Sequence, residues 1–435
     1  MRILFLSAGT GSFHCGISYR DNALVSGLRA CGHSVGLVPL YLPLCLDETD
    51  SSDGPLFLGG INMFLQQHLP LFRATPRWLD AAFDCPALLR QASGLTDMTR
   101  ARGAGTLSAS MLRGRAGNQR KELDRLLRWI EARPRPDVVV LSSILLSGLA
   151  PMLARRAGIP VFCLMGGEEG FIDGLGAPHT EACWQLIRAN AAAIERFLPM
   201  SAYAQDELGR RLHLAPHRMR LLYPGIDLTG YAATPVAECH TGPPVIAFLA
   251  HMVPIKGLHV LVEAFIRLRR ERGDDCRLAV AGSRNLADRA YVAAQCRRLR
   301  RAGLADAASF ACNIDHRAKQ EFLAGASVLA VPALYPEAFG LYCVEAMAAG
   351  VPVVAPRRGA LGELMAATGG GITYPVARAE GPDPDEPEQL AAAVAGMLDD
   401  APLRAELGRS GHAAVRRRFT REITAAALDT LLRTG

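Results

Sequence analysis

The chain has 435 residues, half of them hydrophobic and 21% charged, with a formal net charge of +6. This length exceeds what one compact core accommodates and predicts two domains, and the composition is that of an ordinary soluble protein. The charge is mild and evenly divided along the chain, so we expect no nucleic-acid partner. A long uncharged run, 138–154, is broken by Ser, Gly and Pro, which favours a strand and a helix over a membrane span.

The N-terminal half reads as alternating strands and helices. A glycine-containing loop at 8–16 joins the first strand to an amphipathic helix that ends at Ala30, and Gly16 at the start of that helix is a candidate phosphate contact. Residues 61–130 are predicted to be mostly helical, with an irregular Gly/Arg-rich middle. Strands are expected at 3–7, 34–38, 137–141, 160–164 and 197–201.

The first glycine loop does not match known nucleotide-binding fingerprints. Gly9, Gly11 and Gly16 do not fit G-x-G-x-x-G, and no acidic residue ends the second strand near Leu37. No lysine follows a glycine loop in the Walker arrangement. The spacing therefore argues against nicotinamide, flavin and P-loop enzymes.

Residues 100–135 form the one local charge cluster, with ten Arg or Lys against three acids. Such a cluster could face a membrane surface or an acidic acceptor. A solvated helix face with a flexible loop explains it equally well.

The C-terminal half repeats the alternation after a Pro/Gly-containing linker at 235–244. An acidic loop is expected at 382–387, and helices over 389–432. Two consecutive βα series predict two Rossmann-like α/β domains facing a cleft. The strands of the second series are expected at 245–250, 277–281, 307–311, 328–331 and 351–355.

Two glutamates eight residues apart, Glu337 and Glu345, are the most informative feature of the sequence. Glu337 falls in a loop after a predicted strand, at the sheet edge where open α/β sheets bind ligands. Glu345 falls in a helix over 341–349 without another charge, so it is either buried against a polar group or part of a site. The alternative is that the first caps a helix and the second is a solvated helix position.

Only three of the 48 basic residues are lysines, namely Lys121, Lys256 and Lys319. Lysine and arginine are not interchangeable at a compact phosphate site. Lys256 follows the first strand of the second series and is a candidate phosphate ligand, the alternative being a solvated loop lysine.

These stretches resemble the retaining glycosyltransferases of family 4, which have the GT-B fold. The resemblance covers nearly all of residues 200–432 and is looser before them. The E-x7-E element with its flanks is its most specific part. The motifs are 224–227, Lys256-Gly257, Ala281-Gly282, 336–341, 345–354, Gly359 with Glu363, and the tail 404–419.

The resemblance implies a domain order and a donor. It implies an N-terminal Rossmann-like acceptor-binding domain at 1–235 and a nucleotide-sugar-binding domain at 236–410. The helices at 411–435 would pack back on the N-terminal domain. The donor would be a UDP- or GDP-sugar, used as a co-substrate, without another cofactor.

The resemblance also implies roles for individual residues. Glu345 would bind the donor ribose hydroxyls, and Glu337 would lie against the transferred sugar. The amides of Phe339, Gly340 and Leu341 would contact sugar and diphosphate at a helix N-terminus. Lys256 would neutralise the leaving diphosphate, so that no metal is required. The remaining donor-binding candidates are Gly16, His251 and Gly282.

The chain departs from the family pattern at three places. Ala250-His251 stands where members usually have Gly-Arg, and Gly359-Ala360 replaces a Gly-Gly pair. The usual histidine after an N-terminal-domain strand is replaced by the stretch 165–168. Glu168 or His14 could partly replace it, although each is better explained as structural or acceptor-facing.

The resulting hypothesis is a metal-independent retaining hexosyltransferase of carbohydrate or cell-envelope polysaccharide biosynthesis. It would act on a saccharide, lipid-linked or small-molecule acceptor, by front-face attack assisted by the leaving phosphate. The alternatives are a nucleotide-sugar epimerase or hydrolase of the same fold and a non-catalytic nucleotide-sugar-binding protein. Eleven unpatterned cysteines and the absence of a signal-peptide pattern favour the cytoplasm, with peripheral contact at the inner membrane face through the basic segment.

Overall fold

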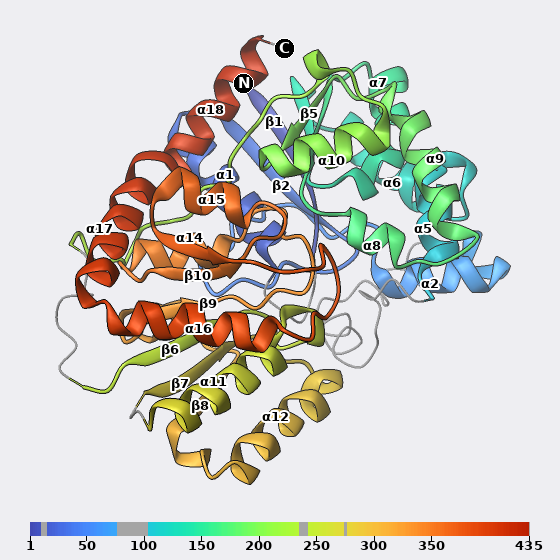
Figure 1. Cartoon of the computed structure of the whole chain (residues 1–435). Coiled ribbons are helices and arrows are strands. Elements are labelled where there is room, and N and C mark those ends of the chain that lie inside the picture. The colour runs from blue at the N-terminus through green and yellow to red at the C-terminus, as the bar shows by residue number, and fades with distance from the viewer. Residues whose placement is uncertain (10–14, 76–102, 235–241, 274–275, 435) are drawn as a thin grey trace. The chain divides into compact units, whose positions relative to one another are not determined.

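The computed structural model describes residues 1–9, 15–75, 103–234, 242–273 and 276–434. It divides into unit 1, Met1–Pro224 with Thr424–Gly435, and unit 2, Gly225–Ile423. Each unit has one all-parallel sheet with helices on it (Figure 1). The prediction of two Rossmann-like α/β domains is therefore confirmed.

The sheet of unit 1 contains all five strands expected in this half, in the order β2-β1-β3-β4-β5. Their continuous apolar character fits a parallel sheet that is covered on both faces. The strands are β1 (Arg2–Ala8), β2 (Ser34–Leu40), β3 (Val138–Leu141), β4 (Val161–Met165) and β5 (Arg196–Pro199).

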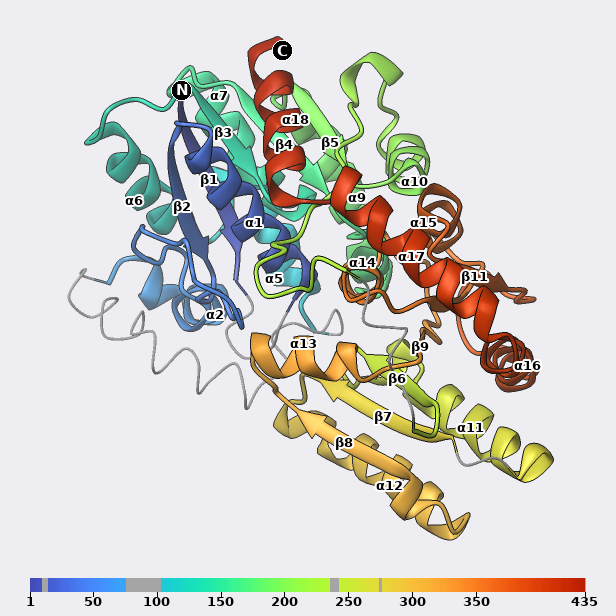
Figure 2. The same cartoon turned by 90° about the vertical axis from the view of Figure 1, so that its left-hand side faces the viewer.

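Side chains of β1 alternate between the two cores of unit 1. Ile3 and Phe5 pack with helices α1 (Gly16–Ala30) and α18 (Arg421–Thr434), which lie on one face (Figure 2). Leu4 and Leu6 face the other core, as the period of two in a strand requires. The helices that contribute to this second core are α2 (Gly60–His68), α5 (Gly105–Leu112), α6 (Arg120–Glu131), α7 (Ala150–Arg156), α9 (His179–Ala191) and α10 (Ala202–Leu212).

The sheet of unit 2 has the order β11-β10-β9-β6-β7-β8. The chain builds β6, β7 and β8 outward on one side and β9, β10 and β11 outward on the other, so the switch point lies between β6 and β9. Ligands bind outside the carboxyl ends of the strands at such a point. The strands are β6 (Val245–Leu249), β7 (Arg277–Gly282), β8 (Ala308–Cys312), β9 (Val328–Ala330), β10 (Val353–Pro356) and β11 (Gly371–Tyr374).

The helices of unit 2 follow the expected alternation. The sequence 382–387, expected as a loop, instead runs into the first turn of α16 at Glu386. The helices are α11 (Leu258–Arg272), α12 (Arg289–Arg301), α13 (His316–Ala324), α14 (Leu341–Ala348), α15 (Leu361–Thr368), α16 (Glu386–Asp399) and α17 (Ala401–Arg418).

The division between the units falls earlier than the 235/236 boundary suggested by the sequence. The Ile226 amide donates to the Phe419 carbonyl at 2.9 Å, and the Arg421 amide donates to the Ile226 carbonyl at 3.0 Å. Arg421 also pairs with Asp227 at 2.5 Å. These bonds hold the segment after Pro224 in unit 2. Most of the expected linker, 235–241, lies outside the described residues.

The C-terminal tail is split between the units instead of joining unit 1 from residue 411. Gly411 packs so closely on Gly370 that a Cβ there would lie 2.9 Å from its Cα, which holds α17 in unit 2. From Thr424 onward the chain belongs to unit 1, where Ala425, Leu428 and Leu432 are core residues. The last helix therefore crosses back to the N-terminal unit.

Candidate active site

Lys256 and Glu337 meet at the switch point of the unit 2 sheet. Lys256 ends a 3-10 helix, Pro254–Lys256, in the loop after β6, and Glu337 lies in the loop after β9. The Lys256 ammonium lies 2.6 Å from Oε1 of Glu337, and the two side chains are 19% and 9% exposed. The structure thus brings together two residues that the sequence proposed separately.

Close backbone contacts position both loops. Gly257 has φ +76°, and a Cβ on it would lie 1.8 Å from the Pro332 carbonyl oxygen, so only glycine allows the β6 loop to approach the end of β9. The Ala360 amide donates to the Glu337 carbonyl at 2.8 Å, which ties the β9 loop to the chain after β10.

Two tyrosines that the sequence analysis did not propose complete this cluster. Lys256 hydrogen-bonds to the Tyr335 hydroxyl, and its ammonium lies 4.8 Å from the Tyr335 ring centroid and 5.2 Å from that of Tyr342. The Tyr342 hydroxyl donates to Oε1 of Glu337 at 2.5 Å. Burial and then the Glu337 charge raise the pKa of Tyr342 well above its usual value, so its phenol stays protonated. Tyr335 lies two residues before Glu337, and Tyr342 lies between the two glutamates, which was the available indication.

Glu345 is paired with Lys319, the second lysine singled out by its rarity. The Lys319 ammonium lies 2.6 Å from Oε1 of Glu345, and the side chains are 7% and 17% exposed. Lys319 comes from the middle of α13 and Glu345 from α14, the helices before and after β9. Of the two expectations for Glu345, contact with a polar group is thus observed, at a mostly but not fully buried position, and its part in a site remains a proposal.

The N-terminus of α14 lies beside these pairs. Gly340 is its N-cap, with φ +95°, and Leu341 is its first residue. The Phe339 ring packs against the Phe419 ring, with centroids 5.7 Å apart, so its side chain is structural and only its backbone could meet a ligand.

Gly282 and His251 occupy the neighbouring ends of β7 and β6. A Cβ on Gly282, whose φ is +141°, would lie 1.8 Å from the Ala250 carbonyl oxygen. His251 Nε2 lies 2.9 Å from Oδ2 of Asp288, a residue the sequence analysis missed and which also accepts from the Asn285 amide at 3.1 Å. The residue that replaces the family's arginine is therefore fixed by a carboxylate. Gly16, the remaining candidate, belongs to unit 1.

Unit 1 has its own polar cluster at the carboxyl ends of its strands. Glu168 accepts from the Gly166 amide at 2.7 Å and the Ile144 amide at 3.2 Å, which supports a structural role. The next residue, Glu169, begins the short helix α8 (Glu169–Asp173), and burial raises its pKa to about 7. His14 lies outside the described residues.

A buried ion pair underlies the same end of the unit 1 sheet. Arg20 and Asp21 pair at 2.7 Å, and Ser7 donates to Asp21 at 2.5 Å. Arg20 also donates to the Ser142 carbonyl at 2.6 Å. The pair links α1 to the ends of β1 and β3, and sequence reasoning did not foresee it.

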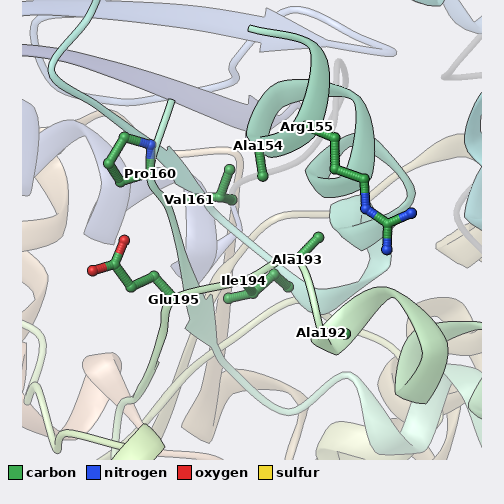
Figure 3. A pocket seen from close by; sticks show the side chains of 8 residues that line it. All are labelled: Ala154, Arg155, Pro160, Val161, Ala192, Ala193, Ile194 and Glu195. Carbon is green, nitrogen blue, oxygen red and sulfur yellow. The ribbon is translucent and has the colours of Figure 1, made fainter. Parts of the chain in front are cut away.

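The pockets of unit 1 that lie away from these clusters include two larger ones, besides one of about 180 Å³. One, of about 260 Å³, is formed where α7 leads into β4 and α9 into β5, with Arg155 and Glu195 on opposite sides (Figure 3). The other, of about 530 Å³, is the cationic pocket, lined by Arg73, Gly117, Asn118, Arg120, Lys121, Asp124 and Arg128.

The described residues contain neither a candidate metal site nor a candidate membrane-spanning helix. No group of three or more His, Cys, Asp or Glu side chains is placed there to hold a metal ion. No helix in the same part of the chain combines the length and apolar character needed to cross a membrane.

Both units match protein families. Residues 16–225 match a family described as "Glycosyl transferase 4-like domain", and residues 235–413 match "Glycosyl transferases group 1". The chain is 31% identical over 299 residues to D-inositol 3-phosphate glycosyltransferase 2 of Catenulispora acidiphila, covering 65% of this chain and 67% of that protein. It is 28% identical over 304 residues to glycogen synthase of Mycobacterium tuberculosis, covering 68% and 67%.

Solved structures share the fold over the whole chain. Anabaena Alr3699/HepE in complex with UDP aligns with a TM-score of 0.67 at 16% identity, covering 100% of both chains. Sucrose-phosphate synthase from Thermosynechococcus elongatus aligns with a TM-score of 0.70 at 18% identity, covering 100% of this chain and 98% of that one. These similarities establish the GT-B fold.

Proposed function

Because the chain belongs to the group 1 glycosyltransferases, we propose that it moves a hexose-type sugar from a UDP- or GDP-sugar to a saccharide, lipid-linked or small-molecule acceptor. The reaction would retain the anomeric configuration and need no metal. The observation that supports this best is the Lys256–Glu337 pair at the switch point, with Glu345 eight residues further along.

Lys256 would stabilise the leaving diphosphate. Negative charge develops on that group as the glycosidic bond breaks, and a preorganised ammonium beside it lowers the barrier. The amides of Phe339, Gly340 and Leu341 at the start of α14 would add donors and the positive end of a helix dipole. Gly282, which allows β7 to approach Ala250, would lie beside the donor, and His251 would be a second ligand of the diphosphate.

Glu337 would position the transferred sugar. Its Oε1 accepts from both Lys256 and Tyr342, which fixes the carboxylate and speaks against a glycosidase-type nucleophile. We propose front-face attack instead, with the acceptor hydroxyl losing its proton to the leaving phosphate. Glu345 would bind the donor ribose.

We also propose that the protein is cytoplasmic and contacts the inner face of the membrane. The cationic pocket supports this membrane contact. Four of its seven lining residues are cationic and one is acidic. Phe64, Leu69 and Leu71, on or near α2 and the 3-10 helix Pro70–Arg73, are 53%, 47% and 78% exposed. Exposed apolar side chains beside cations are the features of a surface that binds anionic lipid.

Vesicle sedimentation tests this contact. The protein should bind phosphatidylglycerol vesicles and not phosphatidylcholine vesicles. Leu71→Asp and Arg120→Glu should each weaken binding several-fold, whereas Arg317→Glu, at a position that is 88% exposed in unit 2, should not. Equal binding of the two vesicle types would contradict the proposal.

The function itself is tested in two steps. A thermal-shift panel of UDP, GDP, ADP and their sugars identifies the donor, since a ligand that binds only the folded state raises the melting temperature. Product analysis with and without acceptors then separates transfer from epimerisation, hydrolysis and simple binding. Glu337→Ala and Lys256→Ala should abolish transfer with the fold retained, and wild-type turnover in either would refute the assigned roles.

A further inference from the structure

The pair between Lys319 and Glu345 is unusual because of its cation. The chain uses arginine for all but three of its 48 basic residues, yet both glutamates of the E-x7-E element are paired with lysine. Lys319 is almost fully buried, and burial of an ammonium is costly unless a partner compensates it. Glu345 thus compensates the charge of the buried lysine, whose desolvation destabilises the fold in a way that an exposed cation would not.

Lysine and arginine engage a carboxylate differently. Arg272 donates from Nη1 and Nη2 to the two carboxylate oxygens of Asp399, which is the usual bidentate geometry of a guanidinium. An ammonium is a point charge without a fork, and Nζ of Lys319 lies 2.6 Å from Oε1 of Glu345. A guanidinium at position 319 would cover both oxygens of Glu345.

We infer that Lys319 is a positioning residue that orients Glu345 through Oε1 and so presents the carboxylate to the 2′,3′-diol of the donor ribose. This inference rests on the proposed function, in which Glu345 binds that ribose. Lys319 would thereby help to determine specificity for ribose over 2′-deoxyribose in the nucleotide. The 2′-hydroxyl would be recognised only while the side chain at position 319 leaves one oxygen of the Glu345 carboxylate available to the ligand.

Binding of ribo- and 2′-deoxyribonucleotides tests the inference. Dissociation constants for UDP, dUDP, GDP and dGDP are measured by calorimetry on the full chain. The wild type should prefer the better ribonucleotide over its 2′-deoxy form by about tenfold or more, the effect of losing a hydrogen bond to a charged group. Glu345→Gln should reduce that preference strongly.

The two substitutions of Lys319 separate positioning from simple charge pairing. Lys319→Met should lower both the melting temperature and the ribose preference. Lys319→Arg should restore the melting temperature but leave the preference below about threefold, because its fork occupies both oxygens. Arg317→Met, on the same helix and exposed, is the matched control and should behave as wild type.

The outcomes distinguish this inference from the proposed function. Lys319→Arg with a wild-type ribose preference would show a structural ion pair and overturn the inference while the function stands. A wild type that binds the nucleotides without ribose preference would refute the role of Glu345 and the inference with it. A wild type that binds none of the four would refute the proposed function and both dependent roles.

Discussion

Replacing Lys256 and replacing Glu337 should both destabilise unit 2, but by different amounts. At the observed 2.6 Å, the gross Coulomb attraction at an effective dielectric of about 20 is roughly 6 kcal/mol. Desolvation of two largely buried groups offsets most of this attraction. The net effect of each substitution therefore depends on the partners left behind.

Those partners differ for the two residues. In Glu337→Gln the Lys256 ammonium keeps its hydrogen bond to the Tyr335 hydroxyl and its contacts with two aromatic rings, and each ring contact contributes about 0.5–2 kcal/mol. We therefore expect the free energy of unfolding to fall by about 1 kcal/mol. In Lys256→Met the buried carboxylate keeps only the Tyr342 donor in this cluster, and we expect a loss of about 3 kcal/mol. The double variant removes both charges and should lose about 2 kcal/mol, less than the sum of about 4.

Differential scanning calorimetry of the four proteins measures these losses. The transition of unit 2 is recognised as the one that moves when the donor nucleotide is added. A coupling of about 2 kcal/mol between the two substitutions is expected. Additivity within about 0.5 kcal/mol, or a larger loss in Glu337→Gln than in Lys256→Met, would refute the reasoning.

Three further substitutions probe other parts of the structure. Gly282→Ala should cost at least about 2 kcal/mol and weaken donor binding. Gly396→Ala, whose added Cβ would meet no atom within 4 Å beyond its chain neighbours and the backbone of its own helix, should stabilise by up to about 1 kcal/mol in calorimetry. Arg358→Met leaves the buried Glu386 without the cation 2.7 Å away and should cost about 3–5 kcal/mol in urea denaturation. The pKa of Glu169 is raised to about 7 in the fold, so the folded state favours the protonated carboxyl. The contribution of this group to the free energy of unfolding is therefore fully present below pH 4.5 and is lost as the pH rises through 7. Glu169→Gln should therefore unfold like wild type at pH 4 and be more stable by on the order of 2 kcal/mol at pH 8, and equal stability at both pH values would contradict the raised pKa.

Most of the fold was predictable because its strands are continuous apolar runs between glycine and proline punctuation. The exception is β11 (Gly371–Tyr374), whose four residues begin with glycine and are mostly only half-buried, so no apolar run marks it. The bonds that hold the segment after Pro224 in unit 2 could not be predicted, because those between Ile226 and the chain around Phe419 join segments nearly two hundred residues apart.

The residues of the candidate site were easier to identify than their partners. The scarcity of lysine singled out Lys256 and Lys319, yet nothing local in the sequence pairs them with Glu337 and Glu345. Such pairing depends on which strand ends become neighbours at the switch point and on the direction of each side chain. The roles of these residues in binding and transfer remain predictions.

The return of α18 has a consequence for how the protein is made. Residues from Thr424 onward leave the ribosome only after all of unit 2 has been synthesised, yet Leu428 and Leu432 help to cover the face of the unit 1 sheet that includes Ile3 and Phe5. Unit 1 therefore cannot close this apolar face during its own synthesis. A nascent chain with such a face exposed is a substrate for chaperones, and a stalled one is prone to aggregate.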